Sequence, residues 1–163
     1  MSTWNTIDTP MGPFTAVVDD GAVLASGWTA GLDELVPLIH PTLRPAELRR
    51  GELAAVGDAV VAYHGGDLSA IDDVPVRQRS GAFLEHAWDV LRTVPAGAPL
   101  TYTEYAAKSG RPAAVRGAAS ACARNAAALF VPCHRVVRTD GTLGGFRWGL
   151  DVKRALLTHE SAA

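Results

Sequence analysis

The sequence FVPCHRVV at Phe130–Val137 is the stretch around which the rest of the chain is organised, since it places a cysteine directly before a histidine. Apolar residues on both sides predict a short buried strand over 126–131, a tight bend at the proline and a second strand. A thiol is a good nucleophile only as the thiolate, which needs a nearby base or positive charge. His134 and Arg135 follow Cys133 directly, so the stretch indicates a reactive cysteine, although an isolated Cys-His pair is also typical of a small buried core residue.

The composition is that of a folded globular protein. The 163 residues are 48% hydrophobic and 20% charged, enough for one domain or two small ones. No stretch is long and apolar enough to span a bilayer, and the first residues do not form a signal peptide. Two unpaired cysteines, Cys122 and Cys133, fit a reducing cytoplasm, so we expect a cytoplasmic protein. Five scattered histidines without a CxxC pattern predict that there is no metal site.

Charge is distributed unevenly along the chain. Residues 1–76 carry three basic and 11 acidic side chains, a net charge of −8, whereas residues 77–163 carry 12 basic and six acidic side chains, a net charge of +6. A basic half joined to an acidic half fits a polyanionic partner such as nucleic acid, but it also fits an uneven, fully solvated surface. The sign changes within a connector at 65–80, so we predict a domain boundary near residue 77.

The first domain, residues 1–76, is predicted to be a small α/β unit without an evident catalytic constellation. Three runs of strand-forming residues separated by turn residues indicate a β-meander, and apolar residues at helical spacing follow. The predicted strands are Trp4–Asp8, Phe14–Val18 and Ala22–Trp28, and the predicted helices are Leu32–Ile39 and Glu52–His64.

The second domain, residues 77–163, is predicted to be mostly helical. Thr101 and Glu104 have the spacing of a capping box at the start of a helix, and a glycine-containing turn leads from this helix to the next. Two short helices joined in this way are typical of a helix-turn-helix. The remaining predicted elements are helices at Gly81–Val94, Ala113–Arg124 and Leu150–Glu160, an Asp-Gly turn at Arg138–Gly141 and a glycine-rich loop at Leu143–Gly149.

The predicted helix Ala113–Arg124 is almost free of large side chains between Gly117 and Ala121. Small residues let a helix approach another surface closely, and that surface is either a packed helix or a nucleic-acid groove. Arg116 and Arg124, one near each end, suit the phosphates on either side of a groove.

The run Val131–Val137 resembles the active-site motif of the O6-alkylguanine-DNA alkyltransferases, also called methylated-DNA–protein-cysteine methyltransferases. The resemblance covers roughly residues 82–160, whereas residues 1–80 are similar to the family's amino-terminal domain only loosely. Ala114–Asn125 and Gly145–Gly149 resemble in particular the carboxy-terminal domain of the bacterial adaptive-response protein. Further positions in the family's register are Leu91–Pro95, Tyr102, Arg116, Asn125 and Leu156–Glu160.

The resemblance implies an α+β fold, in which a small ribonuclease-H-like α/β domain precedes a mostly helical, winged helix-turn-helix-like domain that binds DNA and carries the active site. It implies direct-reversal DNA repair, in which a methyl or small alkyl group moves from O6 of guanine, or O4 of thymine, to Cys133 after base flipping. The transfer would be stoichiometric and irreversible. The resemblance also implies no cofactor and no metal, duplex DNA containing O6-alkylguanine as the partner, no membrane partner and a monomer.

The resemblance assigns catalytic roles to individual residues. Cys133 would be the nucleophile, His134 its base through a water molecule, and Glu160 the group that orients this histidine. Tyr102 would give a proton to the leaving guanine, and Asn125 would hold the bend at the cysteine by hydrogen bonds.

Further roles concern DNA and the substrate pocket. Arg116 would fill the space left by the flipped base while its helix enters the minor groove. A bulky Trp148 beside the pocket predicts a preference for methyl over benzyl lesions. The predicted DNA-binding residues are Arg116, Ala119, Ser120, Ala123, Arg124, Arg135 and Thr103, and the predicted pocket residues are Pro132, Val136, Phe146, Arg147 and Trp148.

Two other classes of function stay open at this point. A cysteine hydrolase would use Cys133 and His134, but the sequence around them lacks oxyanion glycines, and the histidine of such enzymes comes from elsewhere in the chain. A DNA-binding regulator or lesion sensor without chemistry is the other alternative, and such a protein has no need of the thiol at Cys133.

Overall fold

The structure, a computed structural model, describes residues 1–162; residue 163, the last residue of the predicted second domain, lies outside the described residues. The chain divides into two compact units. Met1–Arg79 and Ala126–Phe130 form the amino-terminal unit, whereas Ser80–Asn125 and the chain from Val131 onward form the carboxy-terminal unit. The five residues Ala126–Phe130 thus belong to the first unit, although they lie within the predicted second domain, residues 77–163.

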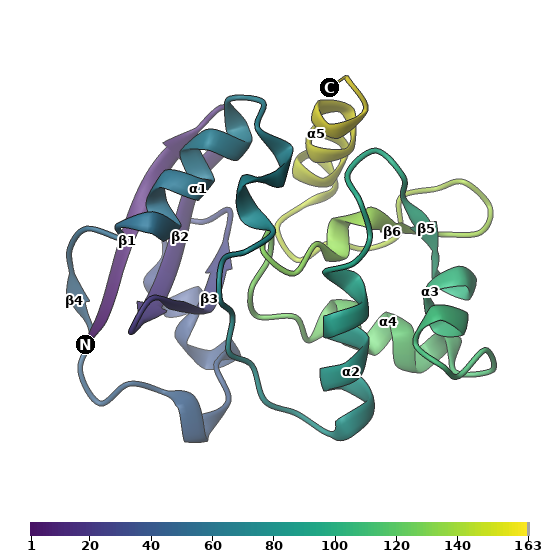
Figure 1. Ribbon diagram of the computed structural model, residues 1–163, viewed down its shortest axis with the longest axis horizontal. Coiled ribbons are helices and arrows are strands. Elements are labelled where there is room, and N and C mark those ends of the chain that lie inside the picture. The colour runs from purple at the N-terminus through teal and green to yellow at the C-terminus, as the bar shows by residue number, and fades with distance from the viewer. Residues whose placement is uncertain (163) are drawn as a thin grey trace. The chain divides into compact units, whose positions relative to one another are not determined.

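The amino-terminal unit is built on a four-stranded sheet of order β3-β2-β1-β4 (Figure 1). The first three strands are antiparallel neighbours, which confirms the predicted meander, and the short β4 runs parallel to β1. Strands β2 and β3 are buried along most of their length, because their apolar residues form the core of this unit. The strands are β1 at Ser2–Thr9, β2 at Gly12–Asp19, β3 at Ala22–Gly27 and β4 at Arg49–Arg50.

Helix α1, Ala55–His64, contacts the sheet through β1 (Figure 1). The single helix predicted at Leu32–Ile39 is wrong, since the structure has two 3-10 turns there instead. Pro37 lacks the N–H that a continuous α-helix requires in its interior, so the segment breaks at Leu35 and Pro37 lies in the second turn, Val36–Leu38. The 3-10 turns of this unit are η1 at Leu32–Glu34, η2 at Val36–Leu38, η3 at Pro41–Leu43 and η4 at Leu68–Ile71.

The strand predicted over 126–131 is also wrong, because these residues form turns with a single parallel bridge between Ala127 and Ser26. Leu129 has a φ of +79°, in the left-handed region, which is incompatible with an extended strand. Ser26 nevertheless anchors the segment, as its N–H donates to the Ala126 oxygen at 2.8 Å and its hydroxyl donates to the Ala128 oxygen at 2.7 Å. The chain just before the Cys-His pair is therefore fixed to β3.

Up to residue 162, the carboxy-terminal unit contains four α-helices and a two-stranded parallel sheet (Figure 1). Helices α2, α4 and α5 begin and end within three residues of their predicted bounds, and α3 begins directly after its predicted cap residue, Thr101. Its elements are α2 at Ala82–Leu91, β5 at Leu100–Thr101, α3 at Tyr102–Lys108, α4 at Val115–Ala123, η5 at Cys133–Arg135, β6 at Val136–Val137 and α5 at Leu150–Ser161.

The capping box at the start of α3 is confirmed, since the Thr101 hydroxyl accepts from the Glu104 N–H at 3.1 Å and the Glu104 carboxylate accepts from the Thr101 N–H at 2.9 Å.

Buried polar side chains join the helices of this unit. Trp88 in α2 donates to the carbonyl of Ala121 in α4 at 2.8 Å, and the Tyr105 hydroxyl of α3 donates to an α2 carbonyl at 2.6 Å. These contacts hold α3 and α4 in one arrangement against α2.

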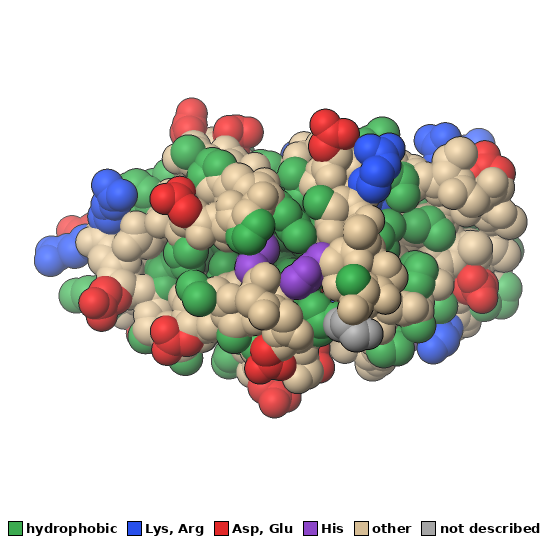
Figure 2. Space-filling view, turned by 90° about the horizontal axis from the view of Figure 1, so that it is seen from above, with side chains coloured by type: hydrophobic (Ala, Val, Ile, Leu, Met, Phe, Trp, Pro, Cys, Tyr) green, Lys and Arg blue, Asp and Glu red, His purple; other side chains and the backbone are tan. Residues whose placement is uncertain are grey.

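Figure 2 shows one face of the molecule, on which acidic and basic side chains stand singly or in small groups among hydrophobic and polar atoms. On this face, the described residues therefore do not form a continuous basic surface, despite the uneven charge of the sequence. Within residues 1–162, no helix combines the length and the apolar character needed to cross a membrane.

Candidate active site

The thiol of Cys133 lies at the first position of η5 and is 7% exposed. Two short hydrogen bonds fix the bend before it, because the Cys133 N–H donates to the Val131 oxygen at 2.8 Å and the Asn125 side-chain amide donates to the same oxygen at 2.7 Å. After η5 the chain enters β6, where Val136 pairs with Leu100 of β5. The cysteine is thus held from both sides, and Asn125 lies where the sequence predicts that it supports the bend.

Glu160 accepts a hydrogen bond from His134 inside the carboxy-terminal unit. His134 Nε2 lies 2.8 Å from Glu160 Oε2, and neither side chain is more than 1% exposed. Burial alone would raise the pKa of Glu160, but hydrogen bonds from His134 and Arg135 and the charge of Arg135 outweigh it and lower the pKa to about 2. Burial lowers the pKa of His134, so its imidazole is neutral near pH 7.

This pairing fixes the tautomer of His134. A neutral imidazole carries one N–H, and an ionised carboxylate can only accept. Nε2 therefore carries the hydrogen and donates to Glu160, which leaves a lone pair on Nδ1. His134 Nδ1 is buried and has no hydrogen-bond partner among residues 1–162. That lone pair is available to accept a proton, one residue along the chain from Cys133.

Arg135 does not lie where a DNA-binding role requires it. Its side chain is 3% exposed, and Nε and Nη2 donate to the two carboxylate oxygens of Glu160, each at 2.9 Å. Nη1 donates to the Val94 carbonyl at 2.7 Å. A buried carboxylate needs a buried cation to offset its desolvation, and Arg135 supplies this charge through a bidentate pair. The predicted DNA contact of Arg135 is thus corrected to a supporting contact of Glu160.

Lys153 is a second buried cation at the site and was not among the predicted site residues. Its side chain is 0% exposed, and Nζ donates to the Val136 oxygen at 2.8 Å and the Gly145 oxygen at 3.3 Å. Burial lowers its pKa. Lys153 lies on the same face of α5 as Leu156 and Glu160, the other buried residues of this helix. Its spacing from them in the sequence was the signal that could have indicated a buried lysine.

Several groups act on the pKa of Cys133. Burial raises this pKa, whereas a hydrogen bond from Asn125 and the charges of Lys153 and Arg147 lower it. Burial outweighs them, so the resting group is a neutral thiol that needs a base to become a nucleophile. His134 Nδ1 has the free lone pair for that role.

Tyr102 begins α3 and is half-buried beside the glycine-rich loop. Burial raises the pKa of its hydroxyl to about 12, so the group is protonated at neutral pH and can donate. Gly144 lies directly against it: a Cβ added to Gly144, whose φ is +76°, would lie 3.1 Å from the Tyr102 hydroxyl oxygen. The loop backbone at Gly144 therefore packs closely against the Tyr102 ring.

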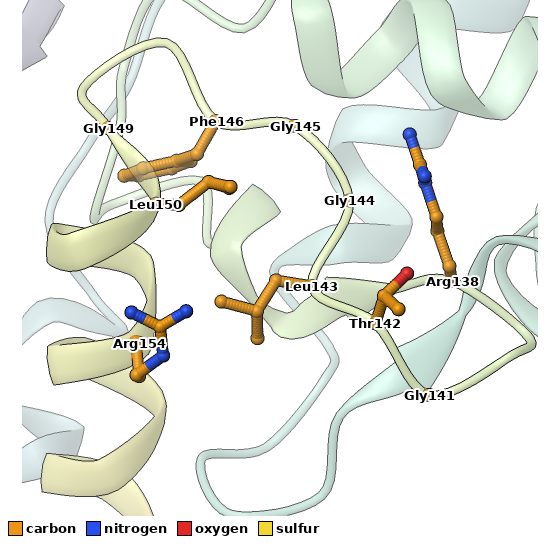
Figure 3. Close-up of a pocket in the computed structure, with 10 residues that line it drawn as sticks. All are labelled: Arg138, Gly141, Thr142, Leu143, Gly144, Gly145, Phe146, Gly149, Leu150 and Arg154. Atoms are coloured by element: carbon orange, nitrogen blue, oxygen red, sulfur yellow. The ribbon is translucent and has the colours of Figure 1, made fainter.

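The loop encloses an open hollow of about 690 Å³, shown in Figure 3. It curves between Arg138 and the start of α5, from which Leu150 and Arg154 face the hollow (Figure 3). Of the predicted pocket residues, Phe146 lines this hollow. Pro132 and Val136 are buried, Trp148 is partly exposed, and the exposed Arg147 donates to the Ala123 carbonyl at 2.7 Å.

Helix α4 has two distinct faces. Ala118 and Ala121 are buried, and a Cβ added to Gly117 would lie 3.0 Å from the Phe83 ring, so this face needs small residues for internal packing. The other face is open. Of the predicted DNA-binding residues, Arg116, Ala119, Ala123, Arg124 and Thr103 are exposed, and Ser120 is partly exposed.

The comparisons with known proteins place similarity along nearly the whole chain. Residues 82–162 match the family model described as "6-O-methylguanine DNA methyltransferase, DNA binding domain". The chain is 34% identical over 158 residues to the methylated-DNA–protein-cysteine methyltransferase of Shigella flexneri, which covers 94% of this chain and 92% of that protein.

Two further relatives differ in how much of them is matched. The bifunctional transcriptional activator/DNA repair enzyme Ada of Escherichia coli is 49% identical over 88 residues, but this chain spans only 25% of its length. The crystal structure of Mycobacterium tuberculosis OGT in complex with DNA is similar with a TM-score of 0.82 and 28% identity, covering 98% of this chain and 93% of that one.

Proposed function

This chain belongs to the methylated-DNA–protein-cysteine methyltransferase family, and we propose that it repairs duplex DNA by moving a methyl group from O6 of guanine to its own Cys133. The α+β fold and the DNA-binding family match over residues 82–162 agree with a DNA repair methyltransferase. We extend the proposal to O4 of thymine and to other small alkyl groups.

The observation that carries the proposal is the buried hydrogen bond of 2.8 Å between His134 and Glu160. This bond leaves His134 Nδ1 as a proton acceptor on the residue that directly follows Cys133. A water molecule between Cys133 Sγ and Nδ1 would pass the thiol proton to the imidazole, and the Glu160 carboxylate would stabilise the imidazolium that forms. Arg135 fixes this carboxylate, and the buried charge of Lys153 favours the thiolate once the proton has left.

The transfer itself is a single displacement. The sulfur electron pair forms a bond to the methyl carbon, the bond from that carbon to O6 breaks, and its electrons remain on the guanine. Tyr102, protonated because its pKa is about 12, is the group that would donate a proton to the guanine as negative charge develops. The product is a thioether without a good leaving group, so each molecule would react once, without a cofactor or a metal.

DNA would meet the open face of α4. A narrow minor groove accepts small side chains such as Ala119 and Ala123, and Arg116 would occupy the space of the flipped nucleotide. In this arrangement α3 and α4 act as a winged helix-turn-helix, the amino-terminal unit is a ribonuclease-H-like domain, and the protein acts as a monomer.

The test is the intact mass of the protein after it is mixed with a duplex that carries one O6-methylguanine. We expect a gain of one methyl group, located on Cys133 and saturating at one per molecule, and no gain with unmodified duplex. Cys133→Ala should abolish the gain, whereas Cys122→Ala, which removes the other thiol of the same unit, should retain it. A folded protein with a reduced Cys133 that gains no mass would refute the proposal, and tight binding without transfer would identify a lesion sensor.

A further inference from the structure

Residues 141–149, here called the pocket loop, have little regular structure of their own. Gly141, Gly144 and Gly149 all have positive φ, between 76° and 102°, a region that favours glycine. Backbone hydrogen bonds hold the two ends of the loop, from the Arg138 N–H to the Thr142 oxygen at 3.0 Å and from the Lys153 N–H to the Gly149 oxygen at 3.2 Å. Two side chains contact its middle. Lys153 donates to the Gly145 oxygen at 3.3 Å, and Arg147, part of the loop itself, donates to the Ala123 oxygen at 2.7 Å. Lys153 and Arg147 are therefore the side chains that join the middle of the loop to α5 and α4.

The contact of Arg147 is made at a specific place, the carboxyl end of α4. Ala123 is the last residue of this helix, and the last carbonyls of a helix have no N–H partner within it. The same end carries the negative pole of the helix dipole, so a guanidinium is favoured there both as a donor and as a cation. Arg147 thus satisfies a carbonyl that α4 leaves open.

The contact also reaches the catalytic groups in two ways. Three residues before Arg147, the loop backbone at Gly144 lies against the ring and hydroxyl of Tyr102. The positive charge of Arg147 is close enough to Cys133 to favour its thiolate form. One side chain therefore acts on the end of the helix proposed to meet DNA, on the wall beside Tyr102 and on the charge near the thiol.

We propose that Arg147 is a positioning residue that couples α4 to the pocket loop and places the loop, and with it Tyr102, for transfer from a duplex substrate. This inference rests on the proposed methyl transfer. When the contact is present, the loop stays against Tyr102 and the guanidinium stays near Cys133. When it is lost, the loop moves away from both groups, while the exposed face of α4 is unchanged.

The proposal predicts a specific pattern in Arg147→Ala. The single-turnover rate constant for methyl transfer from duplex DNA should fall by on the order of tenfold, the factor expected for the loss of one charge-assisted hydrogen bond. The dissociation constant for the duplex should change no more than in Lys108→Ala. That control removes an exposed positive charge from the last turn of α3, at the opposite end of the helix from Tyr102.

Hydrogen exchange measures the contact without any DNA. We expect the amides of residues 142–149 to exchange faster in Arg147→Ala than in the wild-type protein or in Lys108→Ala. Arg147→Gln keeps a donor but no charge, so it should restore part of the protection from exchange. Arg147→Lys keeps the charge, so it should restore the pH profile for alkylation of Cys133 by iodoacetamide, which Arg147→Gln should not.

Unchanged exchange in Arg147→Ala would overturn the inference, and so would a lower transfer rate without faster exchange. Arg147→Ala could also lose rate because the whole protein is less stable, which a lower melting temperature would show. If Arg147→Lys did not relieve that loss, the inference would be overturned as well. These outcomes differ from a failure of the proposed function, in which the wild-type protein itself takes no methyl group from the duplex.

Discussion

Glu160→Gln removes the charge at the centre of the buried network while it keeps the shape of the side chain. In the wild-type protein this carboxylate accepts one hydrogen bond from His134 and two from Arg135, between 2.8 and 2.9 Å. A glutamine can accept at only one of its two terminal atoms, and its NH₂ group would face a donor of Arg135. The guanidinium would then be buried without a counter-charge.

Two estimates of the free energy of unfolding that Glu160→Gln would remove agree. Breaking a buried ion pair by removing one partner costs about 3–5 kcal/mol. The lowering of the Glu160 pKa from its usual 4.5 to about 2 corresponds to about 3 kcal/mol. Because the pKa is depressed in the folded state, this stabilisation is complete above pH 4.5 and is lost as the pH falls toward 2.

Urea denaturation at a series of pH values tests this reasoning. The free energy of unfolding falls by about 2 kcal/mol per molar urea, so the unfolding midpoint of the variant at pH 7 should lie about 1.5 M below that of the wild-type protein. The difference between the two midpoints should narrow as the pH falls below about 4.5, since protonation of Glu160 in the wild-type protein removes the charge that the variant lacks. Asp151→Asn, which removes an exposed carboxylate 3.3 Å from Arg154 on the same helix, should leave the midpoint unchanged.

A shift of less than about 0.5 M at pH 7 would refute the stabilising role of the network, because about 1 kcal/mol is too little for a buried pair. A gap that stays constant from pH 7 to pH 3 would refute the assignment to the ionised carboxylate.

Two other substitutions test the catalytic geometry. Gly144→Ala puts a Cβ 3.1 Å from the Tyr102 hydroxyl at a φ of +76°, so the transfer rate should fall on the order of tenfold to a hundredfold at unchanged DNA affinity; a wild-type rate would contradict the placement of Tyr102. Lys153→Met removes the buried cation that favours the thiolate, so the pKa of Cys133 should rise and its alkylation by iodoacetamide near pH 8 should slow. The same pH profile in this variant and in the exposed control Arg154→Met would show that Lys153 has no such effect.

Local patterns in the sequence were sufficient for most elements of the fold. Runs of strand-forming residues between turn residues predicted the meander β1–β3, and a cap residue followed three positions later by a glutamate predicted the start of α3. The wrong predictions occurred where one local sequence pattern is compatible with two structures. The apolar run before Cys133 is typical of a buried strand, but a left-handed Leu129 turns it into an irregular segment whose polar groups bond to Ser26.

The sequence by itself determined that a cysteine lies at a rigid bend beside a histidine, and that a short helix with small residues precedes it. Only the tertiary structure decided which groups surround them. Arg135 was predicted to contact DNA but is buried, and Lys153, to which the sequence assigned no role, is buried where its charge acts on Cys133. The spacing of apolar residues in the sequence indicates which face of a helix is buried. The partner of a buried charge, in contrast, is set by packing between segments that lie far apart in the chain. The pairing of Glu160 with His134, 26 residues earlier, is such a case.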